Sequence, residues 1–239
     1  MIKQSQKIVV LLMGKPGAGK GTQADILRDK LGLVHFNTGE VIRHCVANPQ
    51  TPEDRREKEN YVSGRLTTFT WVARLVKEEA RKYAKAGQGI VFSGSPRSLY
   101  EARQLLPQII ADYGKDKVVA IILNIDDELA VKRNSGRLTC DSCGFTMTPN
   151  PARLSKVKGS SCGQCGGKLI QRVIDQPEII REKRLPEYYK NTAPTIDFIR
   201  KLGIARDLDG RKGIPQVAWE IEQIIDHVVN KVSKHKIKN

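Results

Sequence analysis

The chain has 239 residues, which is enough to bury one large core with small insertions without requiring two full domains. Hydrophobic residues make up 39% of it and charged residues 28%, and no apolar run approaches the roughly 18 residues of a transmembrane helix. We therefore expect a globular protein with no membrane partner. The N-terminus leads into the first apolar run without signal-peptide features, which predicts a cytoplasmic protein with reduced cysteines.

The net charge of +15 favours either nucleic acid or a polyphosphate as the partner. Aromatic residues are only 5% and do not interleave with a basic cluster, which disfavours stacking on single strands. Part of the excess lies in a basic C-terminal tail over 231–238, and solubility alone would explain that tail.

The first predicted elements lie in residues 7–22, KIVVLLMGKPGAGKGT. A continuous β-branched and apolar run predicts a buried parallel strand over 8–13, followed by a glycine-rich turn and a helix. In such a loop the backbone N–H groups, the helix N-terminus and a lysine cradle phosphate. The pattern GxxxxGK[ST] is met, except that a glycine stands before the hydroxyl residue; its positions are Gly14, Gly19, Lys20, Gly21 and Thr22.

Helices and apolar runs then alternate along the chain. Predicted helices cover 22–31, a segment beginning after the turn Asn37–Gly39, 67–86, 100–111, a segment from 127, a segment from 177, and 217–232. Predicted strands lie within 33–36, 90–93 and 117–125, with a weaker fifth strand at 205–208. The polar segment 48–60 is expected to be an exposed helix or a mobile flap.

This alternation predicts an α/β fold, a P-loop-type doubly wound parallel sheet of five strands flanked by helices. Ligands on such sheets bind at the carboxyl ends of the strands. Lys20, the pair Asn37–Thr38 and the pair Pro96–Arg97 all follow predicted strands directly. We therefore expect these side chains to share one site.

Between residues 138 and 174 the composition changes to Cys, Gly, Ser, Pro and Lys, which indicates an insertion rather than part of the sheet. It carries two CxxC pairs, each followed by glycine and 18 residues apart, at Cys140, Cys143, Cys162 and Cys165. Four thiolates at this spacing favour a tetrahedral structural zinc over disulfides or a redox motif. Because all four ligands are used, we expect no catalytic position on the metal.

The ordered set of motifs resembles the adenylate kinases, the nucleoside monophosphate kinases that carry a long lid. It runs nearly from end to end through GKPGAGKGTQ (14–23), FNTGEVIR (36–43), SGRLT (63–67), SGSPRS (93–98), VKRNSGR (131–137), the four-cysteine lid, EKRLPEYYKNTAP (182–194) and ARDLDG (205–210). The resemblance implies a core of residues 1–36, 67–133 and 175–239, a small helical monophosphate-binding insertion over 37–66, and a zinc-binding lid over 134–174.

The resemblance also implies reversible transfer of the γ-phosphoryl group from Mg–ATP to AMP, through positioning and cationic charge under a closing lid. Nucleotides are then the partners, nucleic acid is not obligatory, and a monomer is expected. The implied catalytic residues are Lys20, Arg97, Arg133 and Arg184. The implied ATP-binding residues are Gly17, Ala18, Gly19, Lys20, Gly21, Thr22, Arg133 and Arg137. The implied monophosphate-binding residues are Thr38, Arg43, Arg65, Thr67, Gly94, Arg97, Glu101, Arg172 and Arg184. The spacing between Arg172 and Arg184 is offset from the family by one residue.

Three positions depart from the family pattern. Glu40 and Ser93 stand where the family has aspartates that order water around magnesium. Loss of the second acid, at Ser93, predicts looser placement of the metal with activity retained. Glu101 stands where a glutamine reads the adenine edge, and a carboxylate suits the two donors of guanine better. Glu101 could instead point to solvent, with Gln104 reaching the base. We expect AMP as the acceptor, with GMP or a broader range of monophosphates as the alternative.

A second alternative is a catalytically weakened nucleotide- or RNA-binding protein. The lost aspartates, the net charge and the basic lid residues favour it; those residues are Arg153, Lys156, Lys158 and Lys168. The arginines implied for both phosphate sites argue against it.

Overall fold

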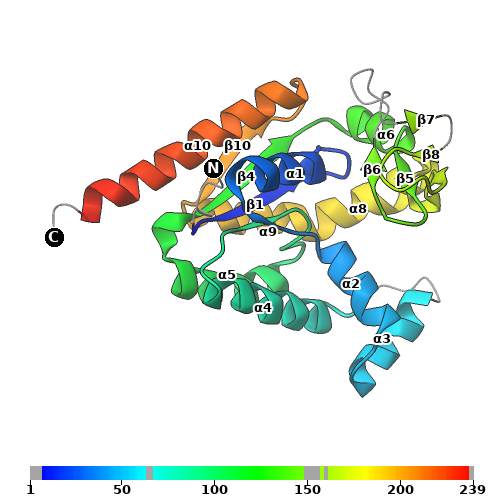
Figure 1. The fold of residues 1–239 in the computed structure, drawn as a ribbon, viewed down its shortest axis with the longest axis horizontal. Coiled ribbons are helices and arrows are strands. Elements are labelled where there is room, and N and C mark those ends of the chain that lie inside the picture. The colour runs from blue at the N-terminus through cyan, green and yellow to red at the C-terminus, as the bar shows by residue number, and fades with distance from the viewer. Residues whose placement is uncertain (1–6, 63–66, 148–156, 159–160, 237–239) are drawn as a thin grey trace.

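The computed structural model describes residues 7–62, 67–147, 157–158 and 161–236. Its centre is a parallel five-stranded sheet in the order β10-β4-β1-β3-β2 (Figure 1). β1 pairs with β4 along its whole length, so that Gly14 stands opposite Leu123. The predicted fold class is confirmed, including the weak fifth strand. The strands are β1 (Val9–Gly14), β2 (Val34–Phe36), β3 (Ile90–Phe92), β4 (Val118–Asn124) and β10 (Ala205–Asp209).

Helices cover both faces of this sheet because alternate strand residues point to opposite sides. Val10 and Leu12 of β1 pack against one helical layer, while Val9 and Leu11 pack against the other. The first layer contains α1 (Lys20–Leu31), α6 (Asp127–Ser135) and α10 (Ile214–Lys236). The second contains α4 (Phe69–Lys85), α5 (Leu99–Tyr113) and α9 (Ala193–Lys201).

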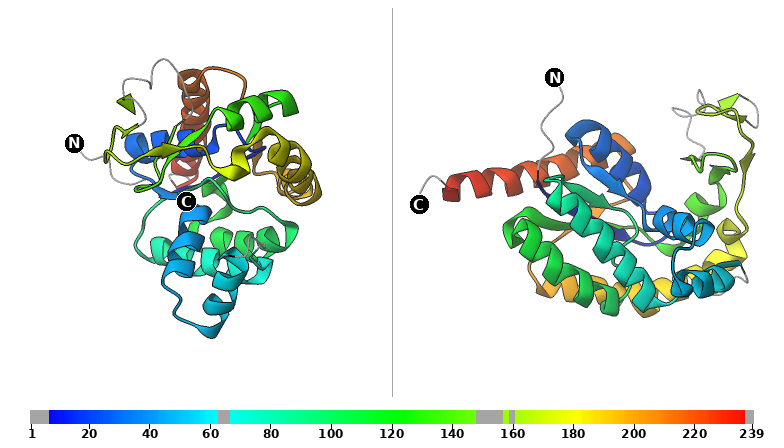
Figure 2. Two further views of the ribbon diagram at one scale, coloured as in Figure 1. Left: turned by 90° about the vertical axis from the view of Figure 1, so that its right-hand side faces the viewer. Right: turned by 60° about the horizontal axis from the view of Figure 1, so that its bottom comes forward.

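Two insertions extend from the same end of the molecule, opposite the end from which α10 projects (Figures 1 and 2). The first is the helix pair α2 (Thr38–Ala47) and α3 (Pro52–Val62). The second, which we call the lid, has small antiparallel sheets of its own. Its strands are β5 (Leu138–Cys140), β6 (Thr146–Met147), β7 (Val157–Lys158), β8 (Ser161–Cys162) and β9 (Leu169–Ile170).

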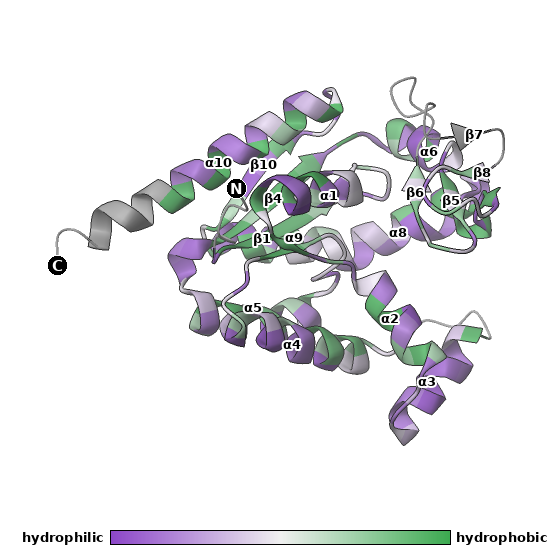
Figure 3. Cartoon of the chain, in the orientation of Figure 1, coloured by the Kyte–Doolittle hydropathy of each residue, from purple (hydrophilic) through white to green (hydrophobic). Residues whose placement is uncertain are grey.

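The sequence predicts an exposed helix or a mobile flap over 48–60. The structure has a helix there, but the helix is not exposed on all sides. α3 is a helix and is almost entirely hydrophilic (Figure 3). Two of its carboxylates, Asp54 and Glu57, are nevertheless buried against α4. Asp54 accepts a hydrogen bond from the indole Nε1 of Trp71, at 2.8 Å, and Glu57 accepts from the backbone N and the hydroxyl of Thr68.

The helical segment that leaves the lid is not a regular α-helix. Short α-turns, α7 (Pro177–Ile179) and α8 (Leu185–Glu187), alternate with π-helical turns over Ile180–Arg184 and Tyr188–Thr192 before α9 begins. A π-turn accommodates one additional residue within a helix. None of the helices in the described part of the chain is long and apolar enough to cross a membrane.

Candidate active site

The glycine-rich loop connects the buried end of β1 to the first turn of α1. Gly19 has φ 92°, a left-handed conformation that glycine adopts without strain, and it places Lys20 at the start of the helix. The Lys20 ammonium folds back over the loop and donates hydrogen bonds to the carbonyl oxygens of Gly14 and Lys15, both at 2.8 Å. The loop therefore has the strand–loop–helix form that the sequence predicted.

Cations from separate elements surround Lys20. Burial of the ammonium, together with the charges of Arg97, Arg184 and Arg137, lowers the pKa of Lys20 to about 7. Burial and the nearby Arg137 likewise lower the pKa of Arg184 to about 10, although Asp175 opposes this. The charges of the three arginines, which add to the effect of burial, give this site an excess of positive potential that suits a multiply charged anion.

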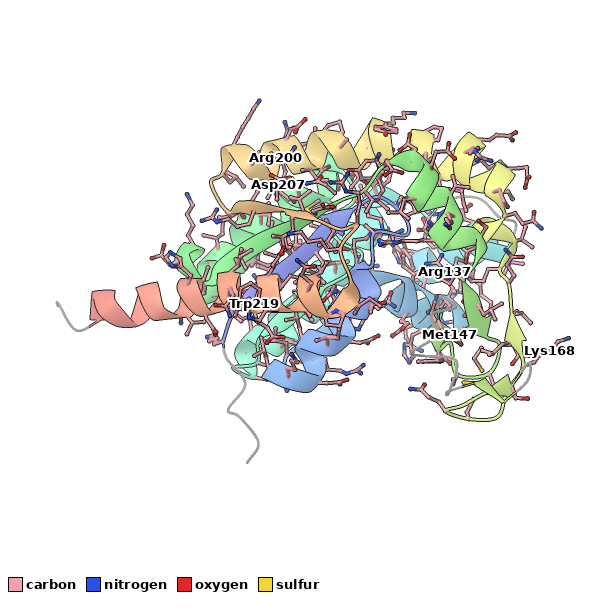
Figure 4. The ribbon with its side chains drawn as sticks, turned by 90° about the horizontal axis from the view of Figure 1, so that it is seen from above. Arg137, Met147, Lys168, Arg200, Asp207 and Trp219 are labelled. Atoms are coloured by element: carbon pink, nitrogen blue, oxygen red, sulfur yellow. The ribbon has the colours of Figure 1, made fainter. Side chains whose placement is uncertain are left out.

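The lid is joined to this cationic centre through one fully buried carboxylate, Asp175. Arg137 and Arg172 each bind it through two guanidinium nitrogens, and Arg184 binds it at 2.8 Å. Burial alone would raise the pKa of Asp175, but the hydrogen bonds and charges of Arg137 and Arg172 outweigh it, so the pKa is lowered. Figure 4 shows Arg137 at the root of the lid, with Met147 and Lys168 further out.

The segment that carries Arg184 contains a π-helical turn. The backbone N–H of Leu185 bonds to the carbonyl of Ile180, five residues earlier, so this turn holds one residue more than a regular α-turn. Arg184 reaches Asp175 together with Arg172, and both arginines come into the same cluster.

Asn134 connects this cluster to the phosphate loop. It is fully buried, its Nδ2 donates to the carbonyl of Ala130, and its Oδ1 accepts from Arg184 at 3.2 Å. The same amide lies so close to Gly17 that a Cβ atom there would stand 2.5 Å from Nδ2. Gly17, at φ +80°, is therefore required both for its conformation and for this close approach. Arg133, on the same helix, donates to the carbonyl of Gly210 at 2.8 Å.

The second group of implied residues surrounds the turn after β3. Thr38, the first residue of α2, is buried and its hydroxyl lies 2.6 Å from that of Ser95. Gly94 packs against Thr38 and against the guanidinium of Arg97, whose Nε donates to the carbonyl of Gly94. Arg43, on α2, is partly exposed and lies 3.9 Å from Glu40.

Glu101 is buried, so it does not point to solvent. One carboxylate oxygen accepts from the backbone N–H of Arg97 at 2.7 Å, and its own backbone N–H donates to the Ser98 hydroxyl. Burial raises the pKa of Glu101, although Ser95 and Arg97 oppose the shift. Its second oxygen, Oε1, has no hydrogen-bond partner among the residues that the structure describes.

The remaining implied residues occupy the expected elements. Ala18 lies buried in the loop, Gly21 and Thr22 lie in the first turn of α1, and Thr67 precedes α4. Arg65, Arg153 and Lys156 lie outside the described residues.

The four lid cysteines converge, with all sulfurs within 4.8 Å of one another. Cys140 lies 3.5 Å from Cys165 and Cys143 lies 3.8 Å from Cys162, close to the separation of about 3.8 Å that tetrahedral zinc–thiolate bonds impose. The backbone N–H of Cys143 lowers the pKa of Cys140 to about 7. The N–H of Phe145 acts likewise on Cys143, but the neighbouring thiols raise its pKa to about 12. The thiols thus resist joint ionisation, and the donor set fits a metal cation that would compensate their charge.

Sequence reasoning missed Asp175 and Asn134. An acidic residue three positions after Arg172 was the only available signal for Asp175. Asn134 gave no signal, because its partners Gly17 and Arg184 lie far away in the sequence.

Comparisons with known proteins agree with this geometry. The family model described as adenylate kinase matches residues 12–204. The adenylate kinase of Syntrophotalea carbinolica is 37% identical over 215 residues, covering 89% of this chain and 95% of the relative. The adenylate kinase of Archaeoglobus fulgidus is 35% identical over 221 residues, covering 92% and 98%. With most of both chains matched above 30% identity, the protein belongs to the adenylate kinase family.

Proposed function

We propose that this protein transfers the γ-phosphoryl group of Mg–ATP reversibly to AMP, giving two ADP. The observation that carries the proposal is the convergence of the charges of Arg97, Arg137 and Arg184 on the buried Lys20, where burial and these charges together lower the pKa of the lysine to about 7. Phosphoryl transfer requires alignment and neutralisation of phosphate oxygens more than a side-chain base. The names of the relatives favour AMP over the GMP and nucleic-acid alternatives.

The division of the site follows from its two groups of residues. The loop 14–22 would hold the donor phosphates through its backbone N–H groups and Lys20, with Arg133 and Arg137 on the lid side. Thr38, Arg43 and Arg97 would hold the phosphate of the acceptor, and Arg172 and Arg184 would bridge the two. Thr67, Arg65 and Glu101 are proposed to surround the acceptor base.

Two metal ions belong to this proposal. The four lid thiolates would hold zinc as a structural ion that stabilises the lid. Magnesium would bind together with ATP and neutralise phosphate charge. Its ligands would be mainly substrate phosphate oxygens and water rather than protein side chains. We further propose a monomer in the cytoplasm, where reduced thiols are available to zinc.

A coupled assay with AMP, GMP, CMP and UMP, with Mg–ATP as donor, tests the proposal. We expect AMP to be preferred, and a clear preference for GMP would contradict AMP as the acceptor.

Lys20→Met should lower phosphotransfer by a factor on the order of a hundred or more, because a cation facing the phosphates is lost. Lys30→Met is the matched control, since Lys30 forms an exposed ion pair with Glu222 far from the loop.

A further inference from the structure

A lysine of the phosphate loop is bound by residues from the segments that enter and leave the lid. Lys15 directly follows β1, and its side chain is only 15% exposed. Its ammonium lies 2.5 Å from Oδ1 of Asp127, the first residue of α6, and 5.3 Å from the ring centre of Tyr189. The Tyr189 hydroxyl donates to the same Oδ1 at 2.8 Å, so the three side chains form a closed cluster.

This cluster is held by charge. Burial would lower the pKa of Lys15, but Asp127 and Tyr189 outweigh burial and raise the pKa. The Lys15 ammonium in turn lowers the pKa of Asp127, although burial opposes this shift. The position of the ammonium over the aromatic ring adds a cation–π attraction to the ion pair. The side chain of Lys15 is therefore fixed outside the loop to which its backbone belongs.

The backbone of Lys15 is also the place where the loop holds the Lys20 ammonium. The carbonyl oxygen of Lys15 accepts from Lys20 Nζ at 2.8 Å and from the backbone N–H of Ala18 at 3.2 Å. Fixing the side chain of Lys15 thus fixes the carbonyl on which Lys20 rests. Asp127 and Tyr189 act on Lys20 through this residue, without touching it.

Tyr189 belongs to the second π-turn, Tyr188–Thr192, and the last residue of that turn reaches a different part of the site. The Thr192 hydroxyl donates to the carbonyl of Arg97 at 3.1 Å. The backbone N–H of Arg97 is held as well, because it donates to Glu101. One five-residue turn therefore contacts the Lys15 cluster and the backbone that carries Arg97.

The two parts of the site that this turn contacts carry like charges. Arg97 is one of the cations whose charge adds to burial in lowering the pKa of Lys20, so the two groups repel each other until an anion lies between them. The backbones that carry them must be held against this repulsion. The contacts of Tyr189 and Thr192 lie on those two backbones or on their anchors, which suits such a role.

We propose that Lys15 and Thr192 are positioning residues that, through the π-turn between their contacts, hold the phosphate loop and the Arg97 turn in the alignment that phosphoryl transfer requires. The inference rests on the proposed function, in which these two parts hold the donor and the acceptor phosphates. Phosphoryl transfer depends on the relative placement of the two nucleotides, and small displacements of reacting groups are costly in rate.

The first test is the rate of a single turnover, measured by rapid quench with enzyme in excess over Mg–ATP and with saturating AMP. Lys15→Met and Thr192→Val should each lower this rate about tenfold, because the two nucleotides lose their alignment. The dissociation constants of ATP and of AMP, each measured by calorimetry, should stay within about twofold of the wild type. A loss confined to the binding of one nucleotide would overturn the inference.

Combining the two substitutions distinguishes a shared alignment from separate local effects. Because either loss releases the same alignment, the double variant of Lys15→Met and Thr192→Val should be within about twofold of the slower single variant. Lys15→Arg should retain most of the wild-type rate, since a guanidinium can pair with Asp127 and stack on Tyr189. Thr192→Ser keeps the hydroxyl and should do the same. Two losses that multiply would show independent roles and would contradict the proposal.

Asp127→Ala separates the position of Lys15 from its charge. If Lys15 acted only as a positive charge near ATP, its release from Asp127 would leave the single-turnover rate unchanged and would not weaken ATP binding. A positioning role predicts a fall in that rate about as large as in Lys15→Met. Lys190→Met is the matched control, because Lys190 is an exposed lysine of the same π-turn, and it should behave as the wild type.

The carbonyl ¹³C resonance of Arg97 in the ligand-free protein gives a test that needs no turnover. Lys15→Met should shift this resonance by disturbing the hydrogen bond from Thr192, and Lys15→Arg should not. An unchanged resonance in Lys15→Met would overturn the inference, whatever the activity of the enzyme.

The two proposals fail in different ways. A folded wild-type protein without phosphotransfer to any monophosphate would remove the proposed function. Wild-type phosphotransfer combined with an unchanged single-turnover rate in Lys15→Met and Thr192→Val would remove only the inference about alignment. Thermal unfolding of each variant separates these results from loss of the fold.

Discussion

The two insertions lie at the same end of the molecule (Figure 1). In neither do the described residues form a large core, and different interactions hold each of them together. The lid has one small cluster formed by Cys140, Met147, Cys162 and Leu169. Two of these four residues belong to the cysteine cluster that could hold a metal, so the small core of the lid and its candidate metal site share residues.

The α2–α3 insertion depends instead on the core helix α4. Val46 packs with Trp71 and Leu75 of α4, and the Trp71 indole also donates to Asp54. Ordinary packing and buried carboxylates thus attach this insertion to the rest of the protein. From this difference we expect the lid to be loosened by removal of a metal from its four thiols, and the α2–α3 insertion to be loosened by protonation of its buried carboxylates. Segments with so few buried contacts are those expected to open locally.

Removing the metal should have the largest effect and should be confined to the lid. Binding of structural zinc contributes on the order of 10 kcal/mol to the folding of small domains, so chelation or Cys143→Ser should unfold the lid and lower phosphotransfer sharply. Amide exchange should accelerate over 138–147 and 161–170 while 52–62 stays protected. The control is Cys45→Ser, because Cys45 is outside the cluster, on α2. Equal acceleration of amide exchange in both insertions would contradict the prediction that the metal stabilises the lid alone.

The next largest effect is expected at the root of the lid. Asp175→Ala would leave Arg137, Arg172 and Arg184 facing one another without the buried carboxylate that they share. Breaking a buried ion pair typically costs about 3–5 kcal/mol, and the partial exposure of these arginines places the expected value near the lower limit. Denaturant unfolding of the wild type and of Asp175→Ala measures this loss in the free energy of unfolding. Asp197→Ala removes an exposed partner of Arg200 and should change stability by less than about 0.5 kcal/mol. A similar loss in both variants would show that burial of Asp175 is unimportant.

For the α2–α3 insertion the prediction concerns Asp54. Burial would raise its pKa, but hydrogen bonds from Trp71, Thr51 and Gln50 outweigh burial and lower it. Asp54→Asn exchanges an acceptor oxygen for a donor group, and leaving buried donors unpaired should destabilise the protein by about 1–3 kcal/mol. The measurement is denaturant unfolding at neutral pH, with amide exchange over 52–62 to locate the effect.

The sign of the pH dependence sharpens this prediction. A carboxyl group whose pKa is lower in the folded state contributes stability that is complete above its unfolded pKa, and lost as the pH falls through the folded value. The stability difference between the wild type and Asp54→Asn should therefore be constant near neutrality and shrink below about pH 4. Acid release of the proposed zinc would affect both proteins equally and would cancel in the difference. A difference that grows on acidification would have the wrong sign.

The sequence was sufficient for those parts of the molecule that depend on local pattern. Continuous apolar runs located the strands, and the glycines with Lys20 located the phosphate loop. The cysteine spacing brought four thiols together correctly. The residues that form each strand and the phosphate loop are close together in the sequence. The four cysteines are further apart, but two CxxC pairs are typical of one shared metal site.

Long-range polar contacts could not be predicted in this way. Asp54 and Glu57 belong to a segment that is charged throughout, and only contact with α4 distinguishes them from their exposed neighbours. The hydrogen bonds that join Asp25, His35 and Ser93 connect three separate parts of the sequence. One signal was available and was missed: Ser98 and Glu101 match the S-x-x-E pattern of a helix N-terminus, and both side chains indeed cap α5 and its preceding turn.

The smallest effect concerns the π-turn that connects the lid to the core. If this turn only absorbs an extra residue, deletion of the exposed Glu182 should convert it into a regular α-turn and leave Arg184 beside Asp175. Phosphotransfer should then stay within about twofold of the wild type, since no phosphate-facing group is displaced.

Insertion of one alanine after Lys183 is the matched control for this deletion. It would rotate Arg184 by about 100° around the helix, away from Asn134 and Asp175, and should lower phosphotransfer far more than the deletion does. Steady-state kinetics measure the phosphotransfer rate of the deletion and of the insertion against the wild type. If the deletion is as damaging as the insertion, the π-turn itself is required, and the lid depends on a hinge as well as on its metal and its ion pairs.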